Sequence, residues 1–193
     1  MTSNQDITLL GISGSLRAGS FSTAVLNTIM AAERAGVAWA GCDLGTIPLY
    51  NQDLDVDGGP AAVSAFRAAI ARSDGLVVVS PEYNYGMPGV LKNALDWASR
   101  PGFASALKGK PVVYMTASPG ALGGARAQVH LLEFFGAVLA RPVIGPQVAI
   151  AGVGQKIEDG RLTDPPTLTV VENAVAALLK EIRNLRSIAA PTG

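Results

Sequence analysis

Short apolar runs alternate along the chain with longer segments whose apolar residues recur every three or four positions. The run Leu76-Val-Val-Val79 is typical of a strand that is buried on both faces, as strands in parallel sheets are. Runs of this kind predict strands over residues 7–13, 37–44, 75–81, 111–118 and 143–150. The amphipathic segments predict helices over residues 22–35, 60–72, 88–99, 123–140 and 167–186.

This alternation predicts an α/β fold, a three-layer doubly wound sandwich around a five-stranded parallel sheet. A loop rich in small and hydroxyl residues follows the first strand, which favours the flavodoxin-like strand order 2-1-3-4-5. A hairpin turning at Asp159-Gly160 and an Asp164 cap are expected before the last helix. We expect residues 1–193 to form a single domain, with residues 1–5 and 187–193 loose.

The helix over residues 123–140 carries two apolar stripes, although a helix that covers one sheet face needs only one. One stripe contains Val129 and Leu132, and the other contains Leu131 and Phe134. Trp97 adds a further apolar surface on the helix over residues 88–99. These surfaces predict a homodimer, or a tetramer, through the two helices. Burial under the chain's own loops is the alternative.

The segment Gly11–Thr23 has the outline of a strand, a tight turn and a helix N-terminus, which together form an anion site. A phosphate ester carries roughly −1.5 to −2 charges at neutral pH, more than a helix dipole can balance. The guanidinium of Arg17 supplies a full positive charge. Hydroxyl donors are available at Ser15, Ser20, Ser22 and Thr23. The segment therefore predicts a phosphate cradle for a bound nucleotide. The alternative is a plain strand–helix connection whose hydroxyls only cap the helix.

Two further loops are expected at the same sheet edge. The stretch Ser80–Gly89 follows the third strand, and its Tyr83, Asn84 and Tyr85 offer ring faces and hydrogen-bonding groups for a flat heteroaromatic ring. The stretch Ser118–Gly124 follows the fourth strand. Ordinary turns with incidental tyrosines and glycines are the alternatives.

Composition and charge exclude several functional classes. Hydrophobic residues make up 49% of the chain and charged residues 16%, and the formal net charge is zero. No basic run suggests nucleic acid. The chain shows no signal sequence and no apolar segment of membrane-spanning length, so we expect a cytoplasmic protein without membrane insertion. The single cysteine, Cys42, allows no internal disulfide. The single histidine, His130, is expected within a helix and away from the loop edge, so a catalytic histidine or a histidine metal site is not expected.

The segments Gly14–Phe21 and Pro81–Trp97 closely resemble the NADPH-dependent FMN reductase family, which includes bacterial chromate and quinone reductases and azoreductases. The resemblance implies bound FMN, NADPH or NADH as co-substrate, and a dimer or tetramer. It also implies an oxidoreductase that transfers hydride by a ping-pong mechanism to quinones, chromate, ferric chelates or azo compounds.

Position by position, the resemblance implies cofactor contacts from all three loops. The phosphate and ribityl contacts would be Ser15, Arg17, Ser20, Phe21 and Ser22. The isoalloxazine loop would be Pro81, Glu82, Tyr83, Asn84, Tyr85 and Gly86, and the third loop would contribute Ser118. No side chain need act as an acid or base, although Glu82 paired with Arg100 would support the chemistry. Arg100 and Arg126 are candidates to reach a neighbouring subunit.

Three rival functions remain at this point. A flavodoxin-like electron carrier would typically be strongly acidic, whereas this chain is neutral. A flavin-bound regulatory module would recognise a protein partner through the Trp97 surface. A nicotinamide dehydrogenase without flavin would be colourless when purified.

Overall fold

The structure is a computed structural model that describes residues 6–189. The strands of its main sheet are β1 (Ile7–Ser13), β2 (Val37–Gly41), β3 (Gly75–Ser80), β4 (Pro111–Ala117), β5 (Arg141–Pro142) and β6 (Val148–Ile150). The helices are α1 (Phe21–Ala31), α2 (Ala61–Arg72), α3 (Gly89–Ala98), α4 (Ala125–Ala137) and α5 (Pro165–Ala189). Short 3-10 turns lie at η1 (Leu44–Thr46), η2 (Gln52–Leu54) and η3 (Val153–Gln155).

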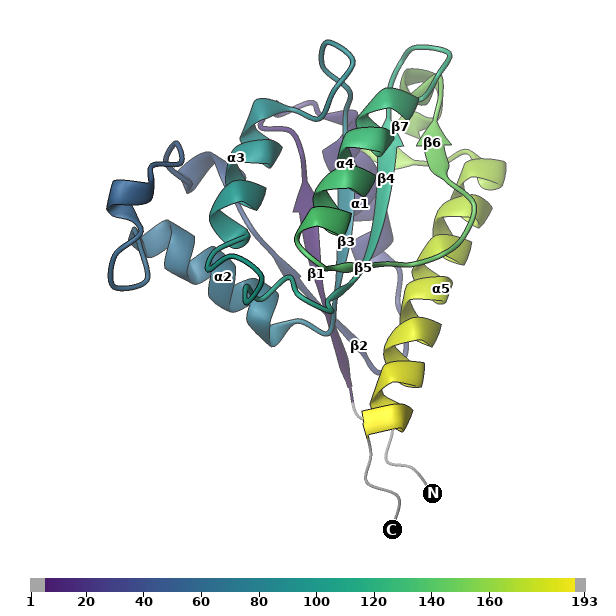
Figure 1. Cartoon of the computed structure of the whole chain (residues 1–193). Coiled ribbons are helices and arrows are strands. Elements are labelled where there is room, and N and C mark those ends of the chain that lie inside the picture. The colour runs from purple at the N-terminus through teal and green to yellow at the C-terminus, as the bar shows by residue number, and fades with distance from the viewer. Residues whose placement is uncertain (1–5, 190–193) are drawn as a thin grey trace.

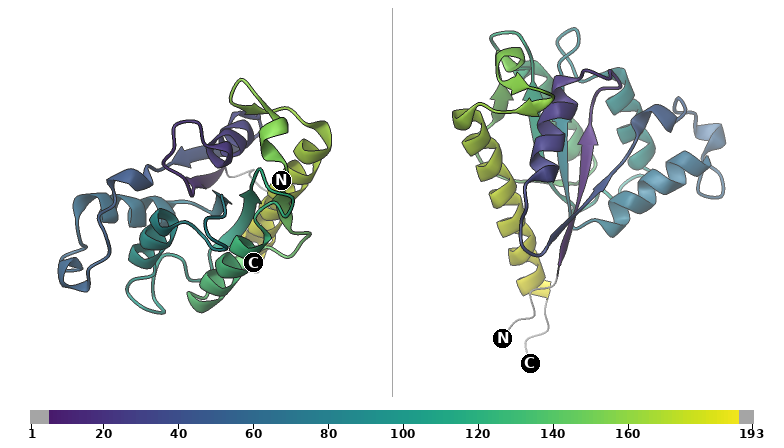
Figure 2. Two further views of the ribbon diagram at one scale, coloured as in Figure 1. Left: turned by 90° about the horizontal axis from the view of Figure 1, so that it is seen from above. Right: turned by 180° about the vertical axis from the view of Figure 1, so that it is seen from behind.

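The main sheet is parallel and has the order β2-β1-β3-β4-β5, with β6 also paired to β4, which confirms the predicted order. Helices α1 and α5 cover one face of the sheet, and α2, α3 and α4 cover the other (Figures 1 and 2). Each strand buries alternate residues in opposite layers: Leu9 joins the core beneath α1 and α5, and Leu10 joins the core beneath α2–α4. A strand buried on both faces must be apolar throughout, which explains the near-continuous apolar runs.

The predicted fifth strand over residues 143–150 is wrong in its extent. Of this stretch and the two residues before it, only β5 and β6 pair with β4, and residues 143–147 between them lie outside the sheet. Pro146 has no N–H to donate to a ladder, and Gly145 beside it weakens a strand. The chain therefore leaves the sheet here, and the Ile144 side chain is exposed.

In the C-terminal part of the chain, the predicted elements are confirmed up to the start of the last helix. The predicted hairpin is formed by β7 (Ile157–Glu158) and β8 (Arg161–Leu162), with Asp159 and Gly160 in the left-handed turn conformation. The Asp164 carboxylate accepts a hydrogen bond from the Thr167 N–H at 3.0 Å, which confirms the predicted helix cap. Helix α5 continues to Ala189, so residues 187–189, expected to be loose, are helical. The expected loose residues 1–5 and 190–193 lie outside the described residues.

Trp97 is fully buried, so the expectation that it forms an exposed docking surface is wrong. Its indole N–H donates to the Pro48 carbonyl at 2.8 Å, and the Tyr50 ring packs edge-on against it at 4.8 Å between centroids. The segment after η1 therefore folds back over α3 and covers the indole. A regulatory role through a Trp97 surface loses its basis. Among residues 6–189, no helix combines the length and apolarity needed to span a bilayer.

Candidate functional site at the carboxyl edge of the sheet

Three loops meet where β1, β3 and β4 end, because the carboxyl ends of adjacent parallel strands share one edge of the sheet. They comprise residues 14–20, 81–88 and 118–124, and they lie at the upper end of the sheet in Figure 1. The structure therefore brings together the three stretches that the sequence singled out.

The first loop is pressed against the end of β3. The Gly14 N–H donates to the Val79 carbonyl at 2.9 Å, and a Cβ added at Gly14 would lie 2.9 Å from the Ser80 hydroxyl oxygen. Only glycine fits this close approach. At the end of the loop, Ser20 is the N-cap of α1, and its hydroxyl accepts from the Thr23 N–H at 3.3 Å.

The remaining hydroxyls of this loop differ in their partners. The Ser13 and Thr23 hydroxyls bond each other at 2.7 Å, so Thr23 is already engaged within the chain. The Ser15 hydroxyl accepts from the Arg17 N–H at 3.3 Å and lies 3.4 Å from the Tyr83 hydroxyl of the second loop. Ser22 is 1% exposed, and its hydroxyl has no hydrogen-bond partner among the described residues. A buried hydroxyl without a partner is costly, and it is expected where a ligand completes the site.

Arg17 places an uncompensated positive charge on the same loop. Its side chain is exposed, and the guanidinium lies 5.3 Å from the centroid of the Phe21 ring. Within residues 6–189 it makes no ion pair with a carboxylate. Its charge is therefore available to an anion at the α1 N-terminus.

The second loop contains a tight turn over Tyr83–Gly86. The Tyr83 and Gly86 backbones exchange two hydrogen bonds of 3.0 Å, and both central residues have positive φ, 49° at Asn84 and 69° at Tyr85. This is the pattern of a type I′ turn, which favours glycine at its second central position. Both tyrosine rings are exposed, Tyr85 at 67%.

Glu82 connects the second loop to α4. One oxygen of its carboxylate, Oε2, accepts from the backbone N–H groups of Arg126 at 2.8 Å and Ala127 at 3.0 Å. The N-cap residue of α4, Gly124, offers no side chain of its own. Glu82 therefore caps this helix from the neighbouring loop.

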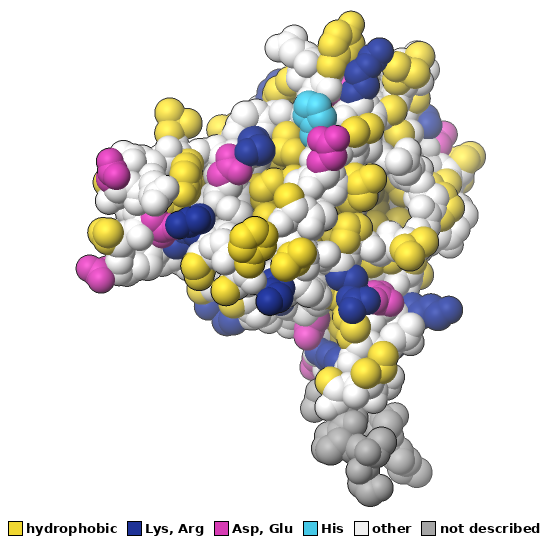
Figure 3. Space-filling view, in the orientation of Figure 1, with side chains coloured by type: hydrophobic (Ala, Val, Ile, Leu, Met, Phe, Trp, Pro, Cys, Tyr) yellow, Lys and Arg dark blue, Asp and Glu magenta, His cyan; other side chains and the backbone are white. Residues whose placement is uncertain are grey.

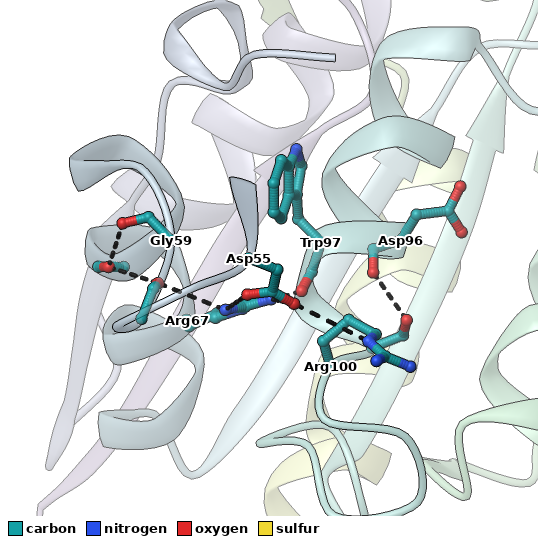
Figure 4. Close-up of polar contacts among 9 residues, drawn as sticks. Asp55, Gly59, Arg67, Asp96, Trp97 and Arg100 are labelled. Carbon is teal, nitrogen blue, oxygen red and sulfur yellow. Dashed lines mark hydrogen bonds and ion pairs between the residues drawn. The ribbon is translucent and has the colours of Figure 1, made fainter. Parts of the chain in front are cut away.

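The expected pair of Glu82 with Arg100 is wrong. Arg100 follows the C-terminal end of α3, a full helix away from the second loop, and its Nε lies 3.8 Å from the Asp55 carboxylate (Figure 4). The Asp55 carboxylate also accepts hydrogen bonds from both terminal nitrogens of Arg67, at 2.7 and 3.0 Å. The Arg67 hydrogen bond, together with the two guanidinium charges, holds the Asp55 pKa below its ordinary value. Arg100 thus belongs to a cluster with Asp55 and Arg67 that anchors the segment after η2.

His130 lies at the loop edge, contrary to the sequence-based expectation. A Cβ added at Gly86 would come within 2.8 Å of the imidazole Nδ1 and Cε1. The reason is the helix start: α4 begins at Ala125 rather than at residue 123, and His130 lies within two turns of its N-terminus. The sequence carries a signal for this contact only in Gly86, whose lack of a side chain makes room for the ring.

The third loop is fixed by two glycines and one serine. The Ser118 hydroxyl accepts from the Gly120 N–H at 3.1 Å, and the Ser118 N–H donates to the Ile150 carbonyl at 3.0 Å. Gly123 has φ of 61°, and a Cβ there would lie 2.6 Å from the Ala149 carbonyl carbon. Ser118 is therefore held at the sheet edge beside the other two loops.

Cys42 and the acidic residues provide no competing site. The Cys42 thiol contacts the Gly11 carbonyl at 3.7 Å, and burial raises its pKa to about 12, so it is protonated at neutral pH. The part of the chain that the structure describes contains no cluster of three or more potential metal ligands.

Comparison with known proteins places this geometry in context. The sequence profile of the NADPH-dependent FMN reductase family matches residues 7–155. The chain is 41% identical over 184 residues to an NAD(P)H-dependent FMN reductase from Pseudomonas aeruginosa, covering 95% of this chain and 99% of the relative. It is 37% identical over 187 residues to a quinone reductase from Escherichia coli, covering 94% and 97%. Among solved structures, the flavoenzyme NAD(P)H:acceptor oxidoreductase FerB from Paracoccus denitrificans superposes with a TM-score of 0.83 at 30% identity, covering 92% and 98%.

Proposed function

As a member of the NADPH-dependent FMN reductase family, the chain is an FMN- and NAD(P)H-dependent oxidoreductase, and we propose that the carboxyl edge of its sheet holds the FMN. The first loop would bind the phosphate and ribityl end through Ser15, Arg17, Ser20, Phe21 and Ser22. The second loop, from Pro81 to Gly86, and Ser118 of the third would bind the isoalloxazine ring.

The observation that supports this proposal is the chemistry of the first loop. Ser22 buries a hydroxyl without a partner, and Arg17 carries a charge without a carboxylate among the described residues, both at the N-terminus of α1. A phosphate ester carries the acceptor oxygens and negative charge that these groups lack. The residues present therefore fit an FMN phosphate.

The second loop would act mainly through its backbone. One carboxylate oxygen of Glu82, Oε2, is committed to α4, which fixes the side chain toward the helix. The exposed Tyr83 and Tyr85 rings offer stacking surface beside the loop. When bound, FMN supplies the hydride chemistry, and the chain positions the ring and shields it.

Quinones are the acceptors that we propose for this enzyme. The Escherichia coli relative is a quinone reductase, and a Burkholderia relative, 48% identical over 118 residues, is a 2-hydroxy-1,4-benzoquinone reductase. Chromate, ferric chelates and azo compounds remain further candidates. Ping-pong kinetics with NAD(P)H and a quinone is the expected pattern, and an obligatory ternary complex would contradict it.

We also propose a homodimer in the cytoplasm, formed through α3 and α4. Val129 and Leu132 on α4 are about half exposed, at 50% and 48%. A groove of about 570 Å³ lies between the two helices and is lined by Lys92 and Asp96 of α3, Phe134 and Ala137 of α4, and Val138 just after α4. Figure 3 shows apolar side chains over this face. A second copy would cover these apolar groups.

Substitution of Arg17 tests the phosphate assignment. We expect Arg17→Ala to weaken FMN binding by about 2 kcal/mol, roughly 30-fold, because a charge-assisted hydrogen bond is lost. Riboflavin lacks the phosphate, so its affinity should be unchanged. Fluorescence titration of the apoprotein with both flavins measures the two effects.

Arg72→Ala is the matched control, because Arg72 is exposed at the end of α2 and makes no ion pair among the described residues. It should bind FMN like the parent. Equal losses of FMN and riboflavin affinity in Arg17→Ala would show that Arg17 does not bind the phosphate.

A further inference from the structure

The turn over Tyr83–Gly86 holds a bulky residue in a conformation that glycine favours. Tyr85 has φ of 69°, where the side chain of an L-residue meets the backbone, and Asn84 has φ of 49°. Asparagine tolerates this region, but tyrosine does not do so readily. The turn persists only if surrounding contacts hold it, and such strain concentrates at functional sites.

Two contacts join this loop to α4, one made by a side chain of the loop and one by a side chain of the helix. From the loop, Glu82 accepts hydrogen bonds from the N–H groups of Arg126 and Ala127. From the helix, the Arg126 guanidinium lies over the Tyr85 ring, 4.2 Å from its centroid. The two contacts thus tie both Glu82 and Tyr85 to the start of α4.

The first turn of α4 has no capping side chain from its own N-cap residue. Gly124 has φ of 88° and no cap side chain, and a Cβ there would lie 2.8 Å from the Thr116 Cβ. A capping serine or aspartate is therefore excluded from this position by the close approach to β4. The cap has to come from elsewhere in the chain, and Glu82 is the residue that supplies it.

We propose that Glu82 and Arg126 form a reciprocal clamp that holds the strained Asn84-Tyr85 turn, which makes both of them positioning residues for the flavin loop. This inference rests on the proposed function, because the loop is the expected isoalloxazine contact. A loop that is held in shape before binding loses less conformational freedom when the ligand arrives. The clamp should therefore raise FMN affinity rather than touch the reacting atoms.

Glu82→Ala removes the cap, and its effect is read from two measurements. Hydrogen exchange at the Gly86 amide reports on the turn itself, because this N–H bonds the Tyr83 carbonyl. We expect exchange at least about tenfold faster in the apoprotein, and FMN binding about tenfold weaker. Glu82→Gln keeps an amide oxygen able to accept both bonds, so it should stay within about threefold of the parent in both measurements.

Asp164→Ala is the matched control, because it also removes a carboxylate cap, from α5. It should destabilise the protein in a similar way and leave Gly86 exchange and FMN affinity within about twofold of the parent. If Asp164→Ala and Glu82→Ala change both measurements equally, loss of a helix cap explains the result and the clamp is overturned.

Tyr85→Gly separates the strain from the cap, and it should fold because glycine accepts the turn. In this background Glu82→Ala should weaken FMN binding by less than about threefold, since no strained residue remains to be held. Arg126→Ala leaves both backbone N–H groups in place and should speed Gly86 exchange by a few-fold. A full tenfold effect of Glu82→Ala in the Tyr85→Gly background would refute the clamp, as would unchanged Gly86 exchange in both Glu82→Ala and Arg126→Ala.

The clamp and the proposed function fail in different ways. Parent protein that does not bind FMN would count against the proposed function, while Gly86 exchange in the apoprotein would still decide the clamp. Parent protein that binds FMN, with Glu82→Ala equal to the parent, would overturn the clamp alone.

Discussion

At the scale of single residues, two buried serines on opposite sides of the molecule have opposite hydrogen-bond states. The Ser22 hydroxyl at the start of α1 has no partner among residues 6–189. The Ser73 hydroxyl after α2 donates to the Ile70 carbonyl at 2.9 Å. An unpaired buried hydroxyl costs about 1–3 kcal/mol, whereas a paired one contributes about 1 kcal/mol.

Ser22→Ala should therefore stabilise the apoprotein, or leave it unchanged, while it weakens FMN binding about tenfold. Ser73→Ala is the control, and it should lower the free energy of unfolding by about 1 kcal/mol without changing FMN affinity. Urea unfolding of the apoprotein and FMN titration give the two quantities. A loss of apoprotein stability in Ser22→Ala equal to that in Ser73→Ala would mean that the hydroxyl is not an empty ligand contact.

The sequence predicts the chemistry of individual residues better than their partners. The hydroxyl-rich turn with Arg17 follows from residue type and spacing alone. The partner of Glu82 does not, because 44 residues separate it from Arg126 and only the packing of α4 beside β4 brings them together. The pairing of Asp55 with Arg67 is not predictable from the sequence for the same reason, since neither residue belongs to a motif.

At the scale of elements, the segment between β2 and α2 is held by polar anchors rather than by regular structure. Asp55 binds Arg67 with both oxygens, and the Arg67 Nε donates to the Trp97 carbonyl at 2.9 Å (Figure 4). The anchor thus joins η2, α2 and α3. It keeps the segment over Trp97 in place.

Asp55→Asn should lower the free energy of unfolding by about 2 kcal/mol at neutral pH, because a largely buried ion pair is lost. The Asp55 pKa lies below its ordinary value in the folded state, chiefly through the Arg67 hydrogen bond. Its contribution is therefore complete above the unfolded pKa of about 3.9 and disappears as the pH falls through the lower folded pKa. The difference between parent and variant should shrink below about pH 4.

Urea unfolding across this pH range measures the effect, and Asp53→Asn is the control. Asp53 is exposed in the same turn, and no ion pair to it is found in the described part of the chain. It should change stability by less than about 0.5 kcal/mol. A difference between parent and Asp55→Asn that stays constant down to acidic pH would contradict the ion-pair account.

The elements themselves follow closely from the apolar pattern. Strand β1 agrees residue for residue with its prediction, and the helices agree to within a few residues at each end. The strand predicted over residues 143–150 is interrupted for a physical reason. Hydrophobicity alone does not show that Pro146 and Gly145 break the hydrogen-bond ladder with β4. The apolar pattern also does not fix where a helix begins. The start of α4, for example, depends on a cap that Glu82 supplies from another loop.

At the scale of the whole molecule, the exposed apolar residues of α4 are the basis of the proposed dimer. Val129 and Leu132 are each about half exposed, at 50% and 48%, although α4 already buries Leu131 and Phe135. The formal net charge of zero places no strong repulsion between two copies. The fold and its strand order are thus well predicted by the sequence, and the assembly is a prediction still to be measured.

Leu132→Glu should convert the dimer to a monomer at micromolar concentration, because a charge buried in an apolar interface costs several kcal/mol. Ile144→Glu is the control, since Ile144 is 99% exposed in the loop between β5 and β6. Light scattering after gel filtration gives the mass of each variant. A parent protein that is already monomeric, or a dimer that survives Leu132→Glu, would place the interface elsewhere.

The path of the chain through its two layers also sets an order of events during synthesis. All three loops of the candidate site lie within the first 124 residues, yet Val171, Val175 and Ile182 of α5 complete the apolar layer that covers β3 and β4. A nascent chain on the ribosome therefore presents all three loops while only α1 covers that face of the sheet. If these loops hold the flavin as proposed, its capture should follow translation of α5, and a chain that stops before residue 165 should be unstable and colourless.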